Sequence, residues 1–400
     1  MIDERYKKNL IFYLSLIGFF GIFTTTMAKN PVLPLFIKGM GGTPDIIGII
    51  SAISPLAGIL FSFPIGVMSD RIGRRKILLI SGSVFLFAPL MYVFVSNAWY
   101  LIPIRFFHGL ATAILGPVAS AAIAEAYDKN KGEKLGAYSS ATLIGRTLAP
   151  IAGGAIISFF LYKGGLFPYK AVYVTAFIAS IPAFLFCLFI KDAEAKIEKR
   201  KPTREEFRDS IKYFFGDARL VSTALVDMAT YFAFGTFETY LPIYLTDNRF
   251  TPGQIGLIFS LQILSIALTK PLFGKLADKI DKRFQIAIGL IVLGSSMLAL
   301  TFFVSPALVI SVSLLFGLGM SFSTVATSAY TGDIADKTKL GASMGALSSV
   351  MDVGHSTGPL VTGFIIAWVN IRAGFIASFV LCSAVALIFV LFTAVKAKAK

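Results

Sequence analysis

The chain has 400 residues, of which 56% are hydrophobic and 15% are charged. Its mean hydropathy of +0.77 is too high for a water-soluble protein, so lipid must be the solvent for much of its surface. The formal net charge of +15 would fit a nucleic-acid partner. Most of the 37 Lys and Arg residues, however, lie between apolar segments on one predicted side of a membrane, as the positive-inside rule describes. We therefore expect a multi-pass protein of the cell membrane, with both termini in the cytoplasm and no nucleic-acid partner.

Apolar runs that are long enough to cross a bilayer recur along the whole chain with few charges inside them. A helical span needs about 18 to 25 such residues, and continuous rather than alternating runs favour helices over barrel strands. The predicted spans are 10–37, 46–69, 77–96, 99–124, 135–161, 168–190, 217–245, 253–274, 284–304, 306–330, 341–368 and 372–395. The sequence therefore predicts an all-α membrane protein with twelve transmembrane helices.

An internal repeat relates the first six predicted spans to the last six. A shift of 208 residues places the following residues on one another: Gly66 on Gly274, Asp70 on Asp278, Gly109 on Gly317, Glu125 on Asp333 and, with a slip of one, Pro150 on Pro359. We interpret the repeat as an ancestral duplication. It predicts two pseudo-symmetric six-helix bundles, 1–190 and 216–400, joined by a cytoplasmic linker, 191–215. Parallel repeats of this kind are the plan of transporters whose binding site lies near the midplane between the halves.

A loop rich in glycine and arginine follows the second predicted span. It reads Gly66-Val-Met-Ser-Asp70-Arg71-Ile-Gly73-Arg74-Arg75-Lys76, and a second copy reads Gly274-Lys-Leu-Ala-Asp278-Lys279-Ile-Asp281-Lys282-Arg283. Glycine permits tight turns and close helix approach, while arginine pairs with acids or lipid headgroups. A positive-inside stop signal would also explain the basic residues, but it would not explain the full spacing.

The first loop resembles the signature of the major facilitator superfamily, G-x-x-x-D-R-x-G-R-R. Three further elements resemble the twelve-span drug:proton antiporter branch of that family. They are Pro31-Val32-Leu33-Pro34, Arg105-Phe-Phe-His108-Gly109 with His where Gln is usual, and Gly145-Arg146-Thr-Leu-Ala149-Pro150-Ile-Ala-Gly153-Gly154 with Ala149 in place of a glycine. The resemblance implies secondary transport by alternating access. It also implies a cytoplasmic gating motif made of Gly66, Asp70, Arg71, Gly73, Arg74, Gly274 and Asp278.

Glycine and proline also interrupt the fifth and eleventh predicted spans. The residues concerned are Gly145, Pro150, Gly153, Gly154, Gly358 and Pro359. Such residues weaken a helical turn and let helices pack closely, which suits a helix that bends during alternating access. Ordinary packing of small residues explains any single glycine equally well. We expect the set as a whole to act as a helix-bending motif.

Ionisable residues inside the predicted spans are the candidates for substrate binding or proton coupling, because a charge in hydrocarbon is costly and usually faces a cavity or a partner. They are Lys29, Arg105, His108, Arg146, Asp227, Glu238, Asp352 and His355. Spacings of three place Arg105 with His108, and Asp352 with His355, on shared helix faces. Asp227 and Glu238 also share a face. Snorkelling to the interface is the alternative for Lys29 and Arg105, and Glu125 and Asp333 are expected to pair with the loop arginines.

The leading functional hypothesis is proton-coupled efflux of a small drug-like or amphipathic molecule by a monomer. Basic candidates in the first half and acidic candidates in the second leave open a proton-linked transporter of an organic anion or a sugar. A receptor or sensor without flux is the alternative from another class. The sequence has no Walker loop, zinc-protease motif or Rossmann fingerprint, and Gly341-Ala-Ser343-Met-Gly345 opens an apolar helix without a preceding strand. We therefore predict no enzymatic activity, no cofactor and no metal.

Overall fold

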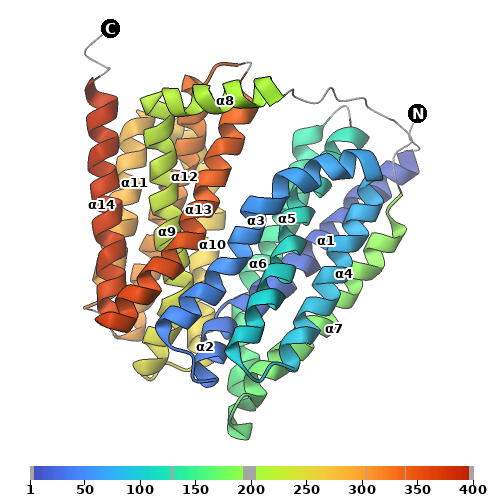
Figure 1. Cartoon of the computed structure of the whole chain (residues 1–400), viewed down its shortest axis with the longest axis vertical. Coiled ribbons are helices and arrows are strands. Elements are labelled where there is room, and N and C mark those ends of the chain that lie inside the picture. Colours follow the sequence, from blue (N-terminus) through green and yellow to red (C-terminus); the bar gives the residue numbers. More distant parts are fainter. Residues whose placement is uncertain (1–3, 128–129, 192–203, 303, 338, 396–400) are drawn as a thin grey trace. The chain divides into compact units, whose positions relative to one another are not determined.

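The fold is known from a computed structural model that describes residues 4–127, 130–191, 204–302, 304–337 and 339–395. The regular structure within these ranges is helical (Figure 1). The helices are α1 (Glu4–Lys29), α2 (Val32–Gly39), α3 (Pro44–Ile72), α4 (Arg74–Val93), α5 (Leu101–Ala126), α6 (Lys131–Phe160), α7 (Phe167–Phe189), α8 (Arg204–Gly216), α9 (Ala218–Asp247), α10 (Pro252–Ala277), α11 (Lys282–Ala299), α12 (Pro306–Ile334), α13 (Leu340–Trp368) and α14 (Ile371–Val395).

Proline defines several of the helix boundaries. Pro44, Pro252 and Pro306 are the first residues of α3, α10 and α12. The first turn of a helix tolerates proline because its backbone nitrogen needs no partner there. Pro31 lies between α1 and α2, so the first predicted span consists of two successive helices.

Every predicted span corresponds to observed helical structure. Within the described residues, eleven segments are long and apolar enough to cross a membrane, the first combining α1 and α2. The remaining predicted span, 341–368, corresponds to α13. This helix is long enough to cross a membrane at 29 residues, but its many glycine and serine residues make it less apolar than the eleven segments. The predicted all-α class with membrane-spanning helices is therefore confirmed.

Packing divides the chain into two compact units. The first contains Met1–Ile197 and Leu245–Ser260, and the second contains Glu198–Tyr244 and Leu261–Lys400. The end of α9 and the start of α10 thus pack with the first unit. This division follows contacts rather than the repeat, so the predicted bundle boundaries stay a prediction.

The first unit has a core of aliphatic and aromatic side chains. Helix α1 packs on α6 and α7, and α5 packs on α3 and α4. Fully or almost fully buried members of the core include Leu14, Leu78, Phe85, Leu115 and Val118. Burial of each such side chain contributes about 1.5–3 kcal/mol, although removal from lipid contributes less than removal from water.

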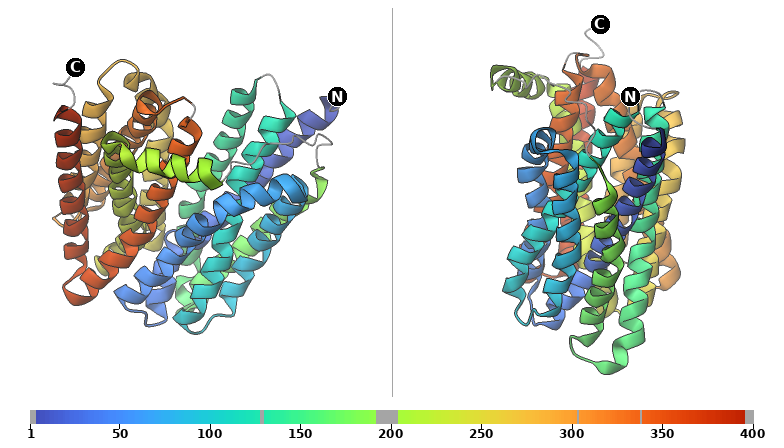
Figure 2. Two further views of the ribbon diagram at one scale, coloured as in Figure 1. Left: turned by 45° about the horizontal axis from the view of Figure 1, so that its top comes forward. Right: turned by 90° about the vertical axis from the view of Figure 1, so that its right-hand side faces the viewer.

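In the second unit, α11 packs between α12 and α14, and α13 packs on α14. Helix α8 packs on α13 and lies near the ends of α9 and α12 (Figures 1 and 2). Its Phe214 is 1% exposed and clusters with Leu220, Ala224 and Leu347. One buried aromatic side chain therefore anchors the polar connecting segment to the second unit.

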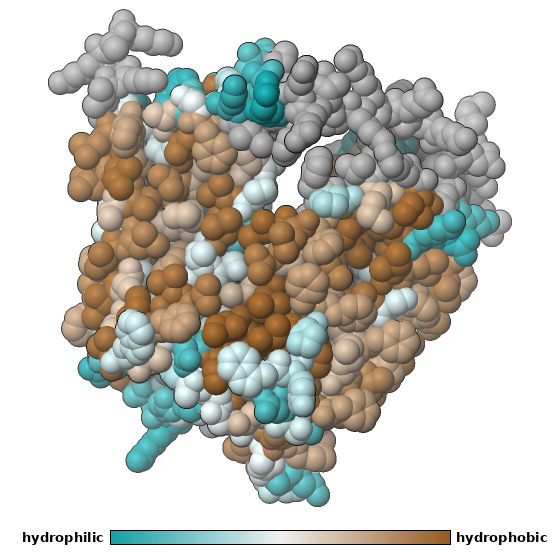
Figure 3. Space-filling view, viewed as in Figure 1, coloured by the Kyte–Doolittle hydropathy of each residue, from teal (hydrophilic) through white to brown (hydrophobic). Residues whose placement is uncertain are grey.

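The surface is typical of a protein in a bilayer. Apolar residues cover the sides of the helices in view, and hydrophilic residues gather at their ends (Figure 3). Large apolar side chains are freely exposed, among them Phe94 at 77%, Phe159 at 71% and Trp368 at 85%. Water would penalise such exposure, whereas hydrocarbon favours it.

Candidate functional site

The first signature loop joins α3 to α4 through a turn at Gly73. The φ angle of Gly73 is 103°, which only glycine adopts readily. The turn directs Arg74 toward Glu125 at the end of α5, where Nη2 and Nε donate to the carboxylate at 2.6 and 3.3 Å. Arg74 also donates to the Ser69 hydroxyl. The side chains of Gly66, Asp70 and Arg71 lie outside the described part of the structure.

The second loop reproduces this contact at the equivalent positions. Lys282 Nζ lies 2.9 Å from the Asp333 carboxylate, and these residues are 208 positions after Arg74 and Glu125. The predicted pairing of Glu125 with a loop arginine is confirmed, whereas Asp333 pairs with a lysine. Asp278 is exposed and makes no hydrogen bond or ion pair with any described residue.

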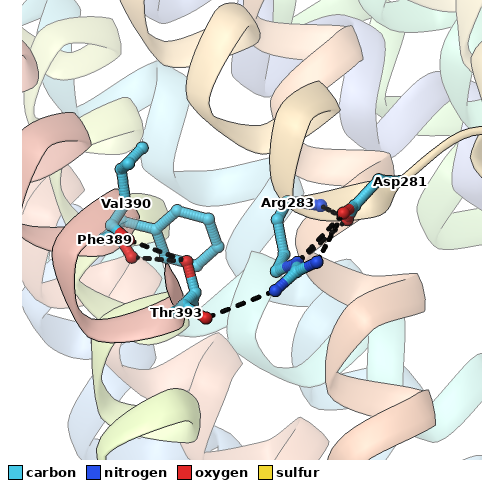
Figure 4. Close-up of polar contacts among 5 residues, drawn as sticks. All are labelled: Asp281, Arg283, Phe389, Val390 and Thr393. Atoms are coloured by element: carbon cyan, nitrogen blue, oxygen red, sulfur yellow. Dashed lines mark hydrogen bonds and ion pairs between the residues drawn. The ribbon is translucent and has the colours of Figure 1, made fainter. Parts of the chain in front are cut away.

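A second duplicated contact ties each loop to the last helix of its half. Arg75 Nη2 donates to the carbonyl oxygen of Leu188 at 3.4 Å, near the end of α7. Arg283 Nη1 donates to the carbonyl oxygen of Thr393 at 3.2 Å, near the end of α14 (Figure 4). Carbonyl groups at a helix end lack intrahelical donors and carry partial negative charge, so an arginine there satisfies and stabilises them.

Asp281 holds Arg283 in this position. Its carboxylate accepts from Arg283 Nη2 at 2.7 Å and from Nε at 3.1 Å, and it caps α11 by accepting from the backbone N–H of Arg283 at 2.9 Å (Figure 4). The hydrogen bond from the guanidinium lowers the pKa of the Asp281 carboxyl below its ordinary value. The residue that replaces the second motif glycine is therefore an N-cap and an orienting partner.

The second unit contains a cavity with a mixed polar and apolar lining beside a buried acid. Asp227 on α9 is 5% exposed and accepts a hydrogen bond from the Thr327 hydroxyl of α12 at 2.7 Å. The cavity has a volume of about 300 Å³. Its polar and sulfur-bearing lining residues are Asp227, Tyr231, Lys270, Thr324, Ser328, Met344, Ser348 and Met351. Lys270, exposed on α10, is near enough for its charge to act on Asp227.

A second buried acid on α9 pairs with a histidine of α13. Glu238 is 6% exposed, and its Oε2 lies 3.0 Å from His355 Nε2. The two helices can approach because Gly235 faces the His355 carbonyl oxygen, where a Cβ would lie only 2.8 Å away. The rings of Tyr231 and Phe234 flank the imidazole at 6.2 and 5.5 Å.

The structure separates some residues that the spacing placed together. Asp227 and Glu238 share α9 but contact different helices, α12 and α13. Asp352 is half-buried on α13, one turn before His355, and makes no hydrogen bond or ion pair with a described residue. A shared face defines only which direction residues point, whereas the neighbouring helices decide which partner each one meets.

The basic candidates lie in different environments within the first unit. Arg105 and His108 on α5 are each 1% exposed, so snorkelling does not describe Arg105. His108 Nε2 is 2.8 Å from the Thr25 hydroxyl of α1. Lys29 is half-buried at the end of α1. Arg146 is exposed on α6 and makes no hydrogen bond or ion pair with any described residue.

The predicted helix-bending residues are sites of close helix packing. Helices α6 and α13 continue through Pro150 and Pro359. A Cβ at Gly154 would overlap the carbonyl oxygen of Pro252, and one at Gly358 would overlap that of Phe232. A Cβ at Gly145 would likewise overlap the carbonyl oxygen of Phe19 on α1, whereas one at Gly153 would lie 3.2 Å from the Val32 side chain at the start of α2. Bending at these positions stays a prediction.

Sequence reasoning missed a basic residue of the α9 cavity, the hydroxyl that donates to Asp227, and one contact at a helix end. Lys270 lies inside the predicted span 253–274, so the rule that selected the other ionisable residues should have included it. Thr327 had no distinguishing signal, because threonine hydroxyls usually bond to their own helix backbone. Lys38 pairs with Asp247 across a long sequence separation that spacing alone does not reveal.

This fold and these residues define the class of the protein: a polytopic helical membrane protein with ionisable residues buried in its spans. The sequence profile described as Major Facilitator Superfamily matches residues 15–251 and 223–400. The chain therefore belongs to the Major Facilitator Superfamily, whose members are transporters and not enzymes.

Comparisons with known proteins agree with this assignment. The chain is 25% identical over 349 residues to an uncharacterised MFS-type transporter of Methanocaldococcus jannaschii, covering 86% of this chain and 88% of the relative. It is 28% identical over 295 residues to the multi-drug resistance efflux pump PmrA of Streptococcus pneumoniae, covering 70% and 69%. A crystal structure of a bacterial homologue of the human lysosomal transporter Spinster, inward-facing and unoccupied, has the same fold, with a TM-score of 0.83, 15% identity and 98% coverage of both chains.

Proposed function

We propose that this transporter exports a drug-like or amphipathic small molecule in exchange for protons. The observation that carries the proposal is the pair of acids buried on α9: Glu238 against His355, and Asp227 beside the cavity and Lys270. Charged groups are costly inside a membrane span and are retained there mainly for function. The similarity to PmrA supports the efflux direction and the drug-like substrate.

The Glu238–His355 pair provides a coupling device. With the carboxylate ionised, His355 Nε2 can donate to Glu238 Oε2 across the α9–α13 contact. A proton delivered to the carboxylate removes its negative charge and weakens this contact. Proton loading on one side and release on the other would thereby alter how α13 packs on α9, which links the protonation state to the conformation.

Asp227 provides the substrate-sensitive acid. The cavity beside it combines a carboxylate, hydroxyl groups and the methionine side chains Met344 and Met351. Methionine adapts to differently shaped apolar groups, which suits a transporter with amphipathic substrates. A substrate cation and a proton would compete for the same carboxylate, so binding of one would favour release of the other. Asp352, half-buried on α13, is a further proton-carrier candidate.

The signature loops complete the proposed cycle as cytoplasmic gates, with both termini in the cytoplasm and the monomer as the working unit. The Arg74–Glu125 and Lys282–Asp333 pairs fix each loop to its own unit. Within the first unit, the Lys38–Asp247 pair and the close approach of Gly154 to Pro252 join the start of α10 to the first six spans. The Lys38–Asp247 pair and the Gly154–Pro252 contact would form and break during alternating access.

The test is transport by purified protein in liposomes with an imposed proton gradient. Flux of a fluorescent amphipathic cation should follow the size and sign of the gradient for the wild type. Glu238→Gln should reduce gradient-driven flux at least tenfold, because glutamine cannot exchange a proton. Asp209→Asn, an exposed acid on α8, is the matched control and should transport normally. Wild-type flux that ignores the gradient would refute proton coupling, and ligand binding without any flux would indicate a sensor.

A second candidate is proton-linked transport of an organic anion or a sugar. Arg146 supports the anion, since it is exposed in the middle of α6 and unpaired among the described residues. A guanidinium in that state suits a carboxylate or phosphate group. This candidate would be favoured over drug efflux if organic anions inhibit cation flux in the wild type and no longer inhibit it in Arg146→Gln.

A further inference from the structure

The first unit encloses an arginine whose charge has no counter-ion among the described residues. Arg105 on α5 is 1% exposed and is the largest fully buried side chain in the described structure. Its Nε and Nη2 groups donate no hydrogen bond, and it forms no ion pair with a described residue. A buried guanidinium normally has acceptors for its donors and an anion for its charge.

Among the described residues, the neighbours of Arg105 are hydroxyl groups and an imidazole rather than carboxylates. The charge of Arg105 acts on both Tyr92 of α4 and Tyr173 of α7, and the guanidinium also forms a hydrogen bond with the Tyr92 hydroxyl. These two rings stack with centroids 4.5 Å apart and an interplanar angle of 11°. The Tyr173 hydroxyl is also buried without a hydrogen-bond partner among the described residues. Three buried donors on two side chains therefore lack an acceptor.

The remaining polar groups nearby are already engaged. The Tyr92 hydroxyl lies 3.4 Å from His108 Nδ1, and the Thr25 hydroxyl lies 2.8 Å from His108 Nε2. These contacts use both ring nitrogens of His108. The described residues thus supply partners to the histidine but no acceptor to Nε and Nη2 of the arginine one turn away.

We propose that Arg105 and Tyr173 bind a small monovalent anion of halide size inside the first unit. An anion would accept from the Arg105 Nε and Nη2 groups and from the Tyr173 hydroxyl, and it would neutralise a charge within a membrane span. Water could supply acceptors but no compensating charge, and charge compensation in a low-dielectric interior is the larger effect. The close enclosure of Arg105 excludes an amphipathic substrate, so this site is distinct from the α9 cavity of the second unit.

The experiment measures thermal unfolding of the purified full-length protein in detergent while sodium chloride replaces sodium gluconate at constant ionic strength. Gluconate is too large for an enclosed site. An anion that binds the native state should raise the apparent Tm saturably, by roughly a few degrees at tenfold excess over its Kd. Bromide should give the same response as chloride. The measurement requires no flux, so its result does not depend on the proposed transport function.

Two variants and one control connect the response to these residues. Arg105→Gln should abolish the saturable chloride response. Tyr173→Phe preserves the ring that stacks on Tyr92 but removes one donor, so it should raise the half-saturating chloride concentration severalfold. Tyr169→Phe, one turn earlier on α7 and half-buried, is the matched control and should respond like the wild type.

The outcomes separate clearly. A saturable halide response that weakens in Tyr173→Phe and persists in Tyr169→Phe supports the site, even if Arg105→Gln fails to fold. An identical Tm in chloride and gluconate would overturn the proposal and leave hydration as the explanation. A halide response unchanged in Tyr173→Phe would also overturn it, because the anion would then bind elsewhere.

Discussion

The two signature-loop ion pairs provide a matched test of how burial determines the strength of an ion pair. Arg74–Glu125 and Lys282–Asp333 occupy equivalent positions of the internal repeat and differ in exposure as well as in the side chains that form them. The side chains of Arg74 and Glu125 are 10% and 19% exposed. Those of Lys282 and Asp333 are 20% and 58% exposed. We expect Glu125→Gln to destabilise the protein far more than Asp333→Asn does.

The magnitudes follow from what each substitution leaves behind. Glu125→Gln leaves a mostly buried guanidinium without its carboxylate, and loss of one partner from a fully buried pair costs about 3–5 kcal/mol. The remaining exposure reduces this to about 3 kcal/mol. Asp333→Asn breaks a largely solvated pair, which is worth about 0–1 kcal/mol. For a half of roughly 200 residues, these values correspond to Tm decreases of about 6–12 °C and at most about 4 °C.

Thermal unfolding of the purified variants, measured side by side in the same detergent, checks this expectation. Raising the salt concentration should reduce the small effect of Asp333→Asn and leave the effect of Glu125→Gln nearly unchanged, because buried pairs are screened less. Equal Tm decreases in the two variants would refute the reasoning. So would a larger decrease in Asp333→Asn, since burial would then not determine the strength of these pairs.

Three further predictions follow from individual contacts. Gly154→Ala should impair transport in the liposome assay by forcing α6 away from α10, whereas Gly132→Ala, which has open space, should not. Asp281→Asn should lower the free energy of unfolding at pH 7 by less than about 1 kcal/mol, seen as a slight decrease in Tm. Because folding lowers the Asp281 pKa, the stabilisation is present above the unfolded pKa of about 3.9 and is lost as pH falls through the folded pKa, so the difference should shrink in acid. Cys187 and Cys382 are both 0% exposed and should resist maleimide, detected by mass spectrometry, until the protein unfolds.

The membrane-spanning elements could be predicted with confidence from local sequence. A bilayer imposes a minimum apolar length on every span, so each run of hydrophobic residues carries its own structural signal. The prediction even holds for 341–368, whose glycines and serines dilute the apolar signal of α13. The break at Pro31 was less visible, because proline within an apolar run is compatible with either a kink or a helix end.

The internal repeat is also visible in the packing of equivalent residues. The shift that superposes Gly109 on Gly317 also superposes their neighbours, since Gly109 approaches the Ser54 carbonyl oxygen and Gly317 approaches that of Gln262. Duplicated sequence positions therefore occupy duplicated packing positions. The hydrogen bonds of Arg75 and Arg283 to helix ends also occupy equivalent positions of the repeat. They could not be predicted from the sequence, because every residue has a backbone carbonyl and its side chain does not indicate which one accepts.

The sequence by itself determined the lipid environment of this protein, its membrane-spanning helical class and its family, because each of these depends on local hydropathy or on recurring residues. The division into two duplicated bundles stays a prediction. Only the tertiary structure decided which buried charges have partners. It paired Glu238 with His355, placed Asp227 beside Lys270, and enclosed Arg105 without an anionic partner among the described residues. The physical reason is that a helix fixes the direction in which a side chain points, whereas its electrostatic environment comes from neighbouring helices that are distant in sequence.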